Sequence, residues 1–191
     1  MHPRSSSHKR LMGALALACV TGAVALAVLP ATASTGATAR RCATSDLVIW
    51  LNTAAGGAAA GTSYYDLELT NLSGRACTLH GYPGVSAVNL VGAQIGSAAA
   101  RDSVYTPHTV TLARTTAGDY ASATATVVLG IATAGNYPRP ICVQTTAAGL
   151  RVFPPGQRAW KVVPFPFIAC SRKGPAILHV QAVQAGIAPG R

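Results

Sequence analysis

Residues 65–70 read YDLELT, and this stretch decides the fold class. The tyrosine and both leucines alternate with polar residues, so one face is apolar and the other polar, as in a half-buried β-strand. Residues 71–74, NLSG, favour a tight turn, and residues 76–79, ACTL, read as the next strand. The pattern predicts a hairpin of these two strands, with Asp66 and Glu68 on its solvent face.

The same period-two pattern recurs from residue 42 to residue 185, with Gly, Pro, Asn and Ser between the apolar runs. Further strands are predicted at 47–51, 85–90, 109–112, 121–129, 150–153, 159–163 and 177–183. Residues 54–61 read as a mobile Gly/Ala loop. Short strands without an amphipathic helix predict an all-β, immunoglobulin-like antiparallel β-sandwich, in which Trp50 and Trp160 fill the core.

The first 33 residues have the layout of a secretory signal peptide. Basic residues precede an uncharged run over residues 11–29, and Ala31 and Ala33 provide the small side chains that a signal peptidase needs. We therefore expect export through the general secretory route and an extracellular or cell-envelope location. Two alternatives stay open: the apolar run is long enough to remain as a membrane anchor, and Cys19 is a candidate for lipidation. Contact with a membrane is expected only if this segment is retained.

The predicted organisation is a signal peptide at 1–33, a short linker at 34–41, a β-sandwich domain at 42–185 and a frayed tail at 186–191. Three of the fifteen basic residues lie in the signal peptide, which leaves twelve against five acidic residues and a formal charge of +7 with histidine neutral. This excess suits an anionic partner such as a cell-wall polymer. The cations are spread singly and without interleaved aromatic residues, so no nucleic acid is expected.

Four cysteines remain once the signal peptide is removed, namely Cys42, Cys77, Cys142 and Cys170. An even number in an exported chain predicts two disulfides. Three pairings are open. The pairing of nearest neighbours, Cys42 with Cys77 and Cys142 with Cys170, closes the shortest loops. A metal site at Cys77 and His80 is not expected, because no second ligand pair joins them and a strand would point them to opposite faces. No metal and no cofactor is predicted.

Several motifs occur in an order that resembles a known family. They are Cys42, Asp46-Leu47, Ala60-Gly61, Tyr65, Leu67, Leu69-Thr70-Asn71, Ser73-Gly74, Cys77-Thr78-Leu79, Gly81-Tyr82-Pro83-Gly84-Val85, Val110-Thr111-Leu112, Cys142, the segment 150–156 and Cys170. Together they resemble the secreted actinobacterial domain of unknown function 4232 (DUF4232). The resemblance implies an exported β-sandwich, often in lipoproteins or surface proteins, and implies no catalytic residues. Residues 113–119 depart from the short Pro-Gly turn usual in the family, which leaves the register there open.

Catalysis is not expected from these residues. Only His80, His108 and His179 remain after the signal peptide to activate a nucleophile, and residues 84–88 lack the last glycine of a nucleophile elbow. The acidic residues of the strand at 65–70 are explained by solvation. A hydrolase with an unrecognised site is kept as an alternative.

The leading interpretation is a noncatalytic cell-surface module that binds a wall polymer, a glycan or another surface protein. Tyr82, Tyr105, Tyr120 and Tyr137 lie near turns, where an amphipathic ring is available for contact. The alternative from another class is a secreted protein inhibitor that inserts a proline-bearing loop, either Arg139-Pro140 or residues 164–167, into an enzyme cleft.

Overall fold

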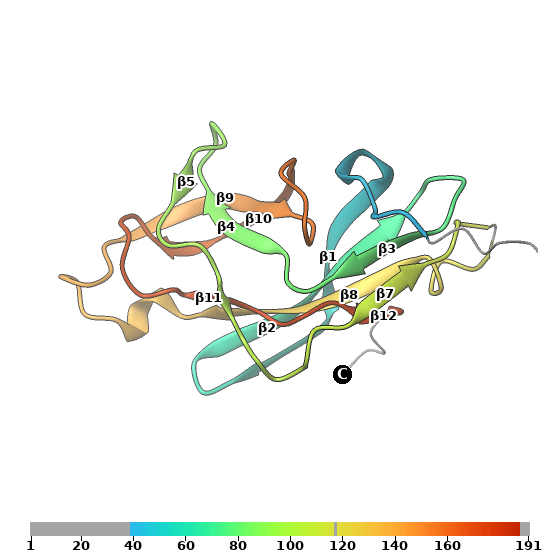
Figure 1. The fold of residues 1–191 in the computed structure, drawn as a ribbon. Coiled ribbons are helices and arrows are strands. Elements are labelled where there is room, and N and C mark those ends of the chain that lie inside the picture. The colour runs from blue at the N-terminus through green and yellow to red at the C-terminus, as the bar shows by residue number, and fades with distance from the viewer. Residues whose placement is uncertain (1–38, 117, 188–191) are drawn as a thin grey trace, which may run out of the picture. The chain divides into compact units, whose positions relative to one another are not determined.

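The computed structural model describes residues 39–116 and 118–187, and this part of the chain is all-β (Figure 1). The prediction of an all-β protein is confirmed. The described residues contain no α-helix, only the 3₁₀ turns η1 (Thr44–Asp46) and η2 (Ala134–Asn136). Within these ranges no helix is both long and apolar enough to cross a bilayer. The predicted signal peptide, Cys19 and the end of the tail lie outside the described residues.

The largest sheet is built around β2, which pairs with a neighbour on each side. Its strands are β1 (Leu47–Ala59), β2 (Thr62–Asn71), β8 (Thr124–Ala132), β11 (Leu178–Val180) and β6 (Ala100–Arg101) in that order, with β12 (Gln184–Ala185) also paired to β8. All of its pairings are antiparallel except that of β11 with β6. β2 is therefore an interior strand with no free edge.

Two smaller antiparallel sheets complete the described fold. One has the order β10 (Lys161–Cys170), β9 (Gln144–Phe153), β4 (Gly84–Val88) and β5 (Gln94–Ile95), and the other pairs β3 (Cys77–His80) with β7 (Thr109–Leu112). Eight leucines drawn from all three sheets are almost completely buried in one core: Leu47, Leu67, Leu69, Leu79, Leu112, Leu129, Leu150 and Leu178. Each such side chain contributes about 1.5–3 kcal/mol by leaving water, so this shared core holds the sheets together.

The predicted hairpin of residues 65–70 with 76–79 is wrong. β2 pairs with β1 and β8, whereas β3 pairs with β7. The turn after β2 does form: the Asn71 side chain donates to the carbonyl of Arg75 at 2.8 Å and accepts from the amide of Ser73 at 3.0 Å. Because both edges of β2 are taken, the chain leaves this turn for another sheet.

The predicted mobile loop at 54–61 is also wrong, because β1 continues to Ala59. The pairing of β1 with β2 shifts between Asn52 and Gly57, and Ala55 inside this irregularity is buried. Ala60 and Gly61 connect the strands with φ of 49° and 76°. Positive φ at both positions is typical of a tight two-residue hairpin turn, for which glycine is favoured.

Trp50 and Trp160 do not fill the core, which corrects another prediction. Their exposed fractions are 38% and 46%. Trp50 alternates with the buried Ile49 and so lies on the outer face of its strand. Trp160 lies beside Arg151, whose guanidinium carbon is 5.8 Å from the centre of the indole ring.

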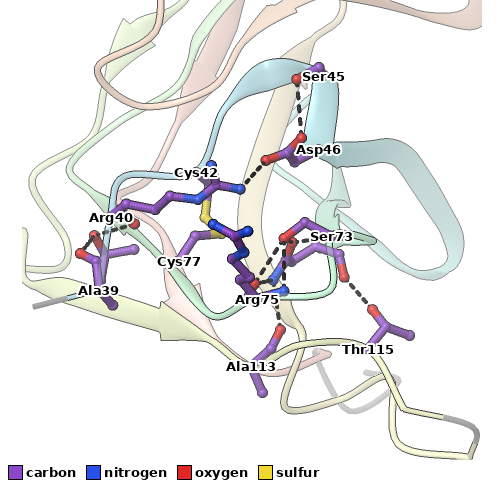
Figure 2. Close-up of a disulfide and its surroundings, with 12 residues drawn as sticks. Ala39, Arg40, Cys42, Ser45, Asp46, Ser73, Arg75, Cys77, Ala113 and Thr115 are labelled. Atoms are coloured by element: carbon purple, nitrogen blue, oxygen red, sulfur yellow. Dashed lines mark hydrogen bonds and ion pairs between the residues drawn. A yellow bond between two sulfur atoms is a disulfide. The ribbon is translucent and has the colours of Figure 1, made fainter. Parts of the chain in front are cut away.

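The four cysteines form two disulfides, Cys42–Cys77 and Cys142–Cys170, so the pairing of nearest neighbours is the one observed. The first ties the segment before η1 to the start of β3 (Figure 2). Next to it, Arg40 donates to the carboxylate of Asp46 at 2.9 Å, as Figure 2 shows. All four cysteines are buried, so both bridges belong to the packed interior. Two structural disulfides fit an extracellular protein.

Candidate functional site

A cavity of about 340 Å³ opens where the start of β2 and the end of β8 approach β10. Its aromatic wall consists of Tyr65, Phe165 and Phe167, and we call it the aromatic pocket. The rings of Tyr65 and Phe165 meet edge to face with centres 5.0 Å apart, and those of Phe165 and Phe167 are 6.1 Å apart. Ser63, Thr133 and Gln144 supply polar groups to the same lining.

The sequence around Phe165 explains how this wall is formed. In β10 the residues Val163, Phe165 and Phe167 turn inward, while Pro164 and Pro166 are exposed. The pairing of β10 with β9 shifts between Pro164 and Phe167, so two prolines lie where ladder hydrogen bonds are interrupted. Proline has no amide hydrogen to donate, which makes an edge strand the position where it is tolerated. The PFPF segment is thus a strand that presents two phenylalanines to the pocket.

A second cavity of about 410 Å³ adjoins the first and is lined by Arg139, Cys142, Val143 and Gln144. We call it the Arg139 pocket. Two of its lining residues are tied to the end of β10, because Cys142 is bonded to Cys170 and the amide of Ser171 donates to the carbonyl of Val143 at 2.8 Å. Gln144 lines both cavities, and we call the two together the composite groove, in which aromatic rings line one cavity and a guanidinium lines the other.

The side chains of this groove are suited to binding rather than to proton transfer. Among the described residues that line it there is no aspartate, glutamate or histidine. Aromatic faces, an amide and a guanidinium offer stacking, hydrogen bonding and charge, but no acid–base pair of the kind that hydrolysis requires.

A family model described as a domain of unknown function (DUF4232) matches residues 42–184. The chain belongs to this family. No curated protein matches the sequence. The predicted resemblance is thereby confirmed, and the matched residues contain the whole composite groove of the DUF4232 domain.

The four tyrosines singled out in the sequence do not line the composite groove of the DUF4232 domain. Tyr82 and Tyr137 pack against the core, and Tyr82 lies under Arg101 at 5.5 Å. Tyr105 is exposed, and Tyr120 lines a separate apolar depression together with Trp50. The aromatic wall comes instead from Tyr65, which was predicted in a strand, and from Phe165 and Phe167, which were predicted in a loop. Only the alternation of the two phenylalanines with prolines could have indicated this wall.

The candidate inhibitor loops have different outcomes. Residues 164–167 are no loop in the DUF4232 domain, because they lie inside β10. Arg139 and Pro140 do lie on an exposed turn, closed by the amide of Ile141, which donates to the carbonyl of Pro138 at 2.9 Å. Both segments line the composite groove, the first through residues 165–167 from within a strand and the second through Arg139 from an exposed turn.

The two acidic residues of β2 are buried rather than solvated, which corrects the predicted solvent face. Asp66 is 1% exposed and Glu68 is not exposed at all. The hydroxyl of Thr126 in β8 donates to the Glu68 carboxylate at 2.5 Å. Trp50 of β1 and Thr126 of β8 are the register partners of Glu68, so their side chains lie beside it on the same face of the sheet, which the alternation alone does not reveal.

The histidines make separate contacts. Nδ1 of His80 is 3.3 Å from the hydroxyl of Thr109, Nδ1 of His108 is 3.4 Å from the carbonyl of Thr106, and Nδ1 of His179 is 3.6 Å from the Asp102 carboxylate. In the part of the chain that the structure describes, no histidine shares a hydrogen bond with a serine.

The pKa of Asp119 is lowered. Its carboxylate accepts hydrogen bonds from the side chain and from the amide of Ser122, and the side-chain bond has the larger effect.

Proposed function

We propose that this DUF4232 domain is a noncatalytic module that binds an acidic glycan of the cell envelope in its composite groove. One observation carries the proposal: Gln144 joins a cavity walled by three aromatic rings to a cavity walled by a guanidinium. The apolar face of a pyranose ring packs on aromatic side chains, and a guanidinium pairs with a carboxylate through two parallel hydrogen bonds. A polymer that alternates sugar rings with anionic groups presents both features side by side.

The electrostatics of the groove support an anionic occupant. Arg139 is exposed and no described acidic residue lines the groove with it, so its charge is available to a ligand. The chain as a whole carries a formal charge of +10. A positive surface raises the local concentration of an anionic polymer and so speeds its capture.

The location and architecture belong to the same proposal. Two disulfides persist in oxidising compartments, which supports export of the mature domain to the cell envelope of an actinobacterium. The three sheets, in which every pairing but that of β11 with β6 is antiparallel, share one core, which supports an immunoglobulin-like sandwich. The intact mass of the protein from its host tests export, because a mass that includes residues 1–33 contradicts cleavage after Ala33.

Calorimetric titration of the purified protein with two matched ligands tests the binding. The first ligand is a tetramer of galacturonic acid, and the second is the same tetramer with its carboxyl groups reduced to alcohols. Arg139→Gln is expected to weaken binding of the acidic tetramer about tenfold, the size of one lost charge-assisted hydrogen bond, without affecting the reduced tetramer. Gln144→Ala is expected to weaken both, because this side chain lines both cavities.

Arg114→Gln is the matched control, since Arg114 is exposed and lies outside the groove. It removes the same charge and is expected to change neither affinity. Equal weakening by Arg114→Gln and Arg139→Gln contradicts recognition by Arg139, and absence of binding of both tetramers contradicts the proposed function. Mass spectrometry of the recovered tetramer is expected to show full length, whereas shortened products contradict a noncatalytic role.

A further inference from the structure

A third cavity, of about 280 Å³, lies at the far end of β9 from the composite groove. It is bounded by Arg41, by Thr78 and His80 of β3, by Thr109 at the start of β7, and by Gly156 in the turn after β9. Gln144 and Phe153 are the two ends of β9, so its ten residues separate the two sites by about 30 Å at the usual rise of a strand. We call it the Arg41 pocket.

We propose that the Arg41 pocket binds a phosphate group, either as free phosphate or as a phosphate monoester. This site is separate from the composite groove and does not depend on the proposed function. Its lining offers a guanidinium, an imidazole and the hydroxyl of Thr109, and contains no described carboxylate, whereas the Thr78 hydroxyl already donates to the carbonyl of Arg40 at 3.4 Å. Such a set of donors around a small cavity matches the charge and the acceptor oxygens of phosphate.

Arg41 is held in place by its neighbours on the backbone. It forms a parallel bridge with Thr78, whose amide donates to the carbonyl of Arg40 at 2.8 Å and whose carbonyl accepts from the amide of Cys42 at 3.0 Å. The Cys42–Cys77 disulfide lies directly beside this bridge. The guanidinium extends toward Gly156 on the opposite side of the pocket. Its Nη1 lies 3.7 Å from the position that a Cβ on Gly156 would take.

The charge of Arg41 is not neutralised by a described neighbour. Arg40, one residue earlier, forms an ion pair with Asp46 at 2.9 Å, which Figure 2 shows. Within residues 39–116 and 118–187, no ion pair includes Arg41. Two adjacent arginines therefore differ: one is paired with a carboxylate, and the other lines a cavity.

His80 and Thr109 provide one further donor whichever tautomer the imidazole adopts. Their Nδ1 and Oγ1 atoms are 3.3 Å apart. If Thr109 donates to Nδ1, the proton of the neutral ring is on Nε2 and is free to donate to a ligand. If Nδ1 carries the proton and donates to Thr109, the hydroxyl hydrogen of Thr109 is free instead. One hydrogen-bond donor beside Arg41 is thus always left for a phosphate oxygen.

The test is an amide-resolved NMR titration of the isotope-labelled protein with inorganic phosphate and, in a second arm, with glycerol phosphate. Shifts are expected at the amides of Thr78, His80 and Gly156. Arg41→Gln is expected to weaken binding at least fivefold, and Thr109→Val about twofold to fivefold, since each removes a donor while keeping a similar shape. Tighter binding of glycerol phosphate indicates an ester as the natural ligand, and equal binding indicates free phosphate.

Arg40→Gln is the matched control. It removes the same charge from the neighbouring residue, whose guanidinium is paired with Asp46 and not with the pocket. It is expected to change phosphate affinity less than twofold. Equal effects of Arg40→Gln and Arg41→Gln indicate nonspecific attraction and overturn the proposal, as does the absence of localised shifts with both ligands. Arg139→Gln is expected to leave phosphate binding unchanged, so failure of this site and failure of the composite groove are distinguishable.

Discussion

Replacing Cys42 and Cys77 together by alanine opens the first disulfide, and the expected loss of stability follows from the length of chain that it closes. The two cysteines are 35 residues apart. The chain-entropy relation gives about 4 kcal/mol for this loop, because the cross-link restricts the unfolded state. Cys142 and Cys170 are 28 residues apart, for which the same relation gives about 3.5 kcal/mol. The two double variants are therefore expected to lose almost the same free energy of unfolding.

Urea unfolding followed by circular dichroism measures both losses against the oxidised protein. For a domain of this size, each loss corresponds to a fall in melting temperature of roughly 8–15 °C. The m-value is expected to rise in both variants, since an unfolded chain without the bridge exposes more surface. A loss below about 1 kcal/mol for either variant refutes the reasoning, as does a difference of more than about 2 kcal/mol between them.

Ligand binding is expected to separate the two variants even though their stabilities match. The first disulfide lies beside the backbone bridge that holds Arg41, so its removal is expected to weaken phosphate binding only. The second includes Cys142, which lines the Arg139 pocket, so its removal is expected to weaken binding of the acidic tetramer only. If both ligands are weakened equally by each variant, the disulfides act through global stability and not through the sites.

Four other perturbations check the fold. Leu67→Ala is expected to lower the free energy of unfolding by about 2–5 kcal/mol, because its side chain is fully buried, whereas the exposed Leu72→Ala is expected to change it by less than about 0.5 kcal/mol in the same urea experiment. Gly149→Ala is expected to destabilise by about 1–3 kcal/mol, since its Cβ would lie 2.4 Å from the carbonyl of Val163, and Gly57→Ala, which meets nothing within 4 Å, is the control in thermal melts. Ser122→Ala is expected to raise the pKa of Asp119 toward its ordinary value in an NMR titration, and an unchanged pKa contradicts the hydrogen bonds. Because the pKa of Asp119 is lowered in the folded state, its contribution to stability is present above the unfolded pKa and is lost as the pH falls through the folded pKa. Both tryptophans are expected to be quenched by acrylamide in the native state, and a blue-shifted, unquenched emission contradicts their exposed positions.

Local alternation was enough to predict that this chain is all-β, and β7 was predicted with its observed bounds, Thr109–Leu112. The strand at Tyr65 was predicted because its leucines alternate with polar residues. The structure shows that both leucines are completely buried. The partner of that strand was not predictable, because alternation states which face is buried but not which edge is paired. Pairing on both sides of β2 is a nonlocal property, and it places the side chains of Trp50 and Thr126 beside the buried Glu68, which the sequence pattern does not show.

The candidate site was predictable only in its parts. Arg139 was singled out in the sequence, but its neighbour Gln144 was not, because one exposed amide has no distinguishing pattern. Pro164 and Pro166 favoured a loop in the sequence. They lie inside β10 instead, because an edge strand tolerates proline. The inward alternation of Val163, Phe165 and Phe167 was the signal that contained the aromatic wall. The Arg41 pocket joins four segments that are distant in sequence, so no local motif could indicate it.

The two exposed prolines of β10 also determine what happens when many copies of the protein crowd together. β10 is the outermost strand of its sheet, and such a strand ordinarily invites a second chain to add itself by backbone pairing. Pro164 and Pro166 have no amide hydrogen, so an incoming strand would find a broken row of donors at this border. Copies at high concentration are thereby protected from aggregating through β10, and replacing both prolines by threonine is expected to remove that protection.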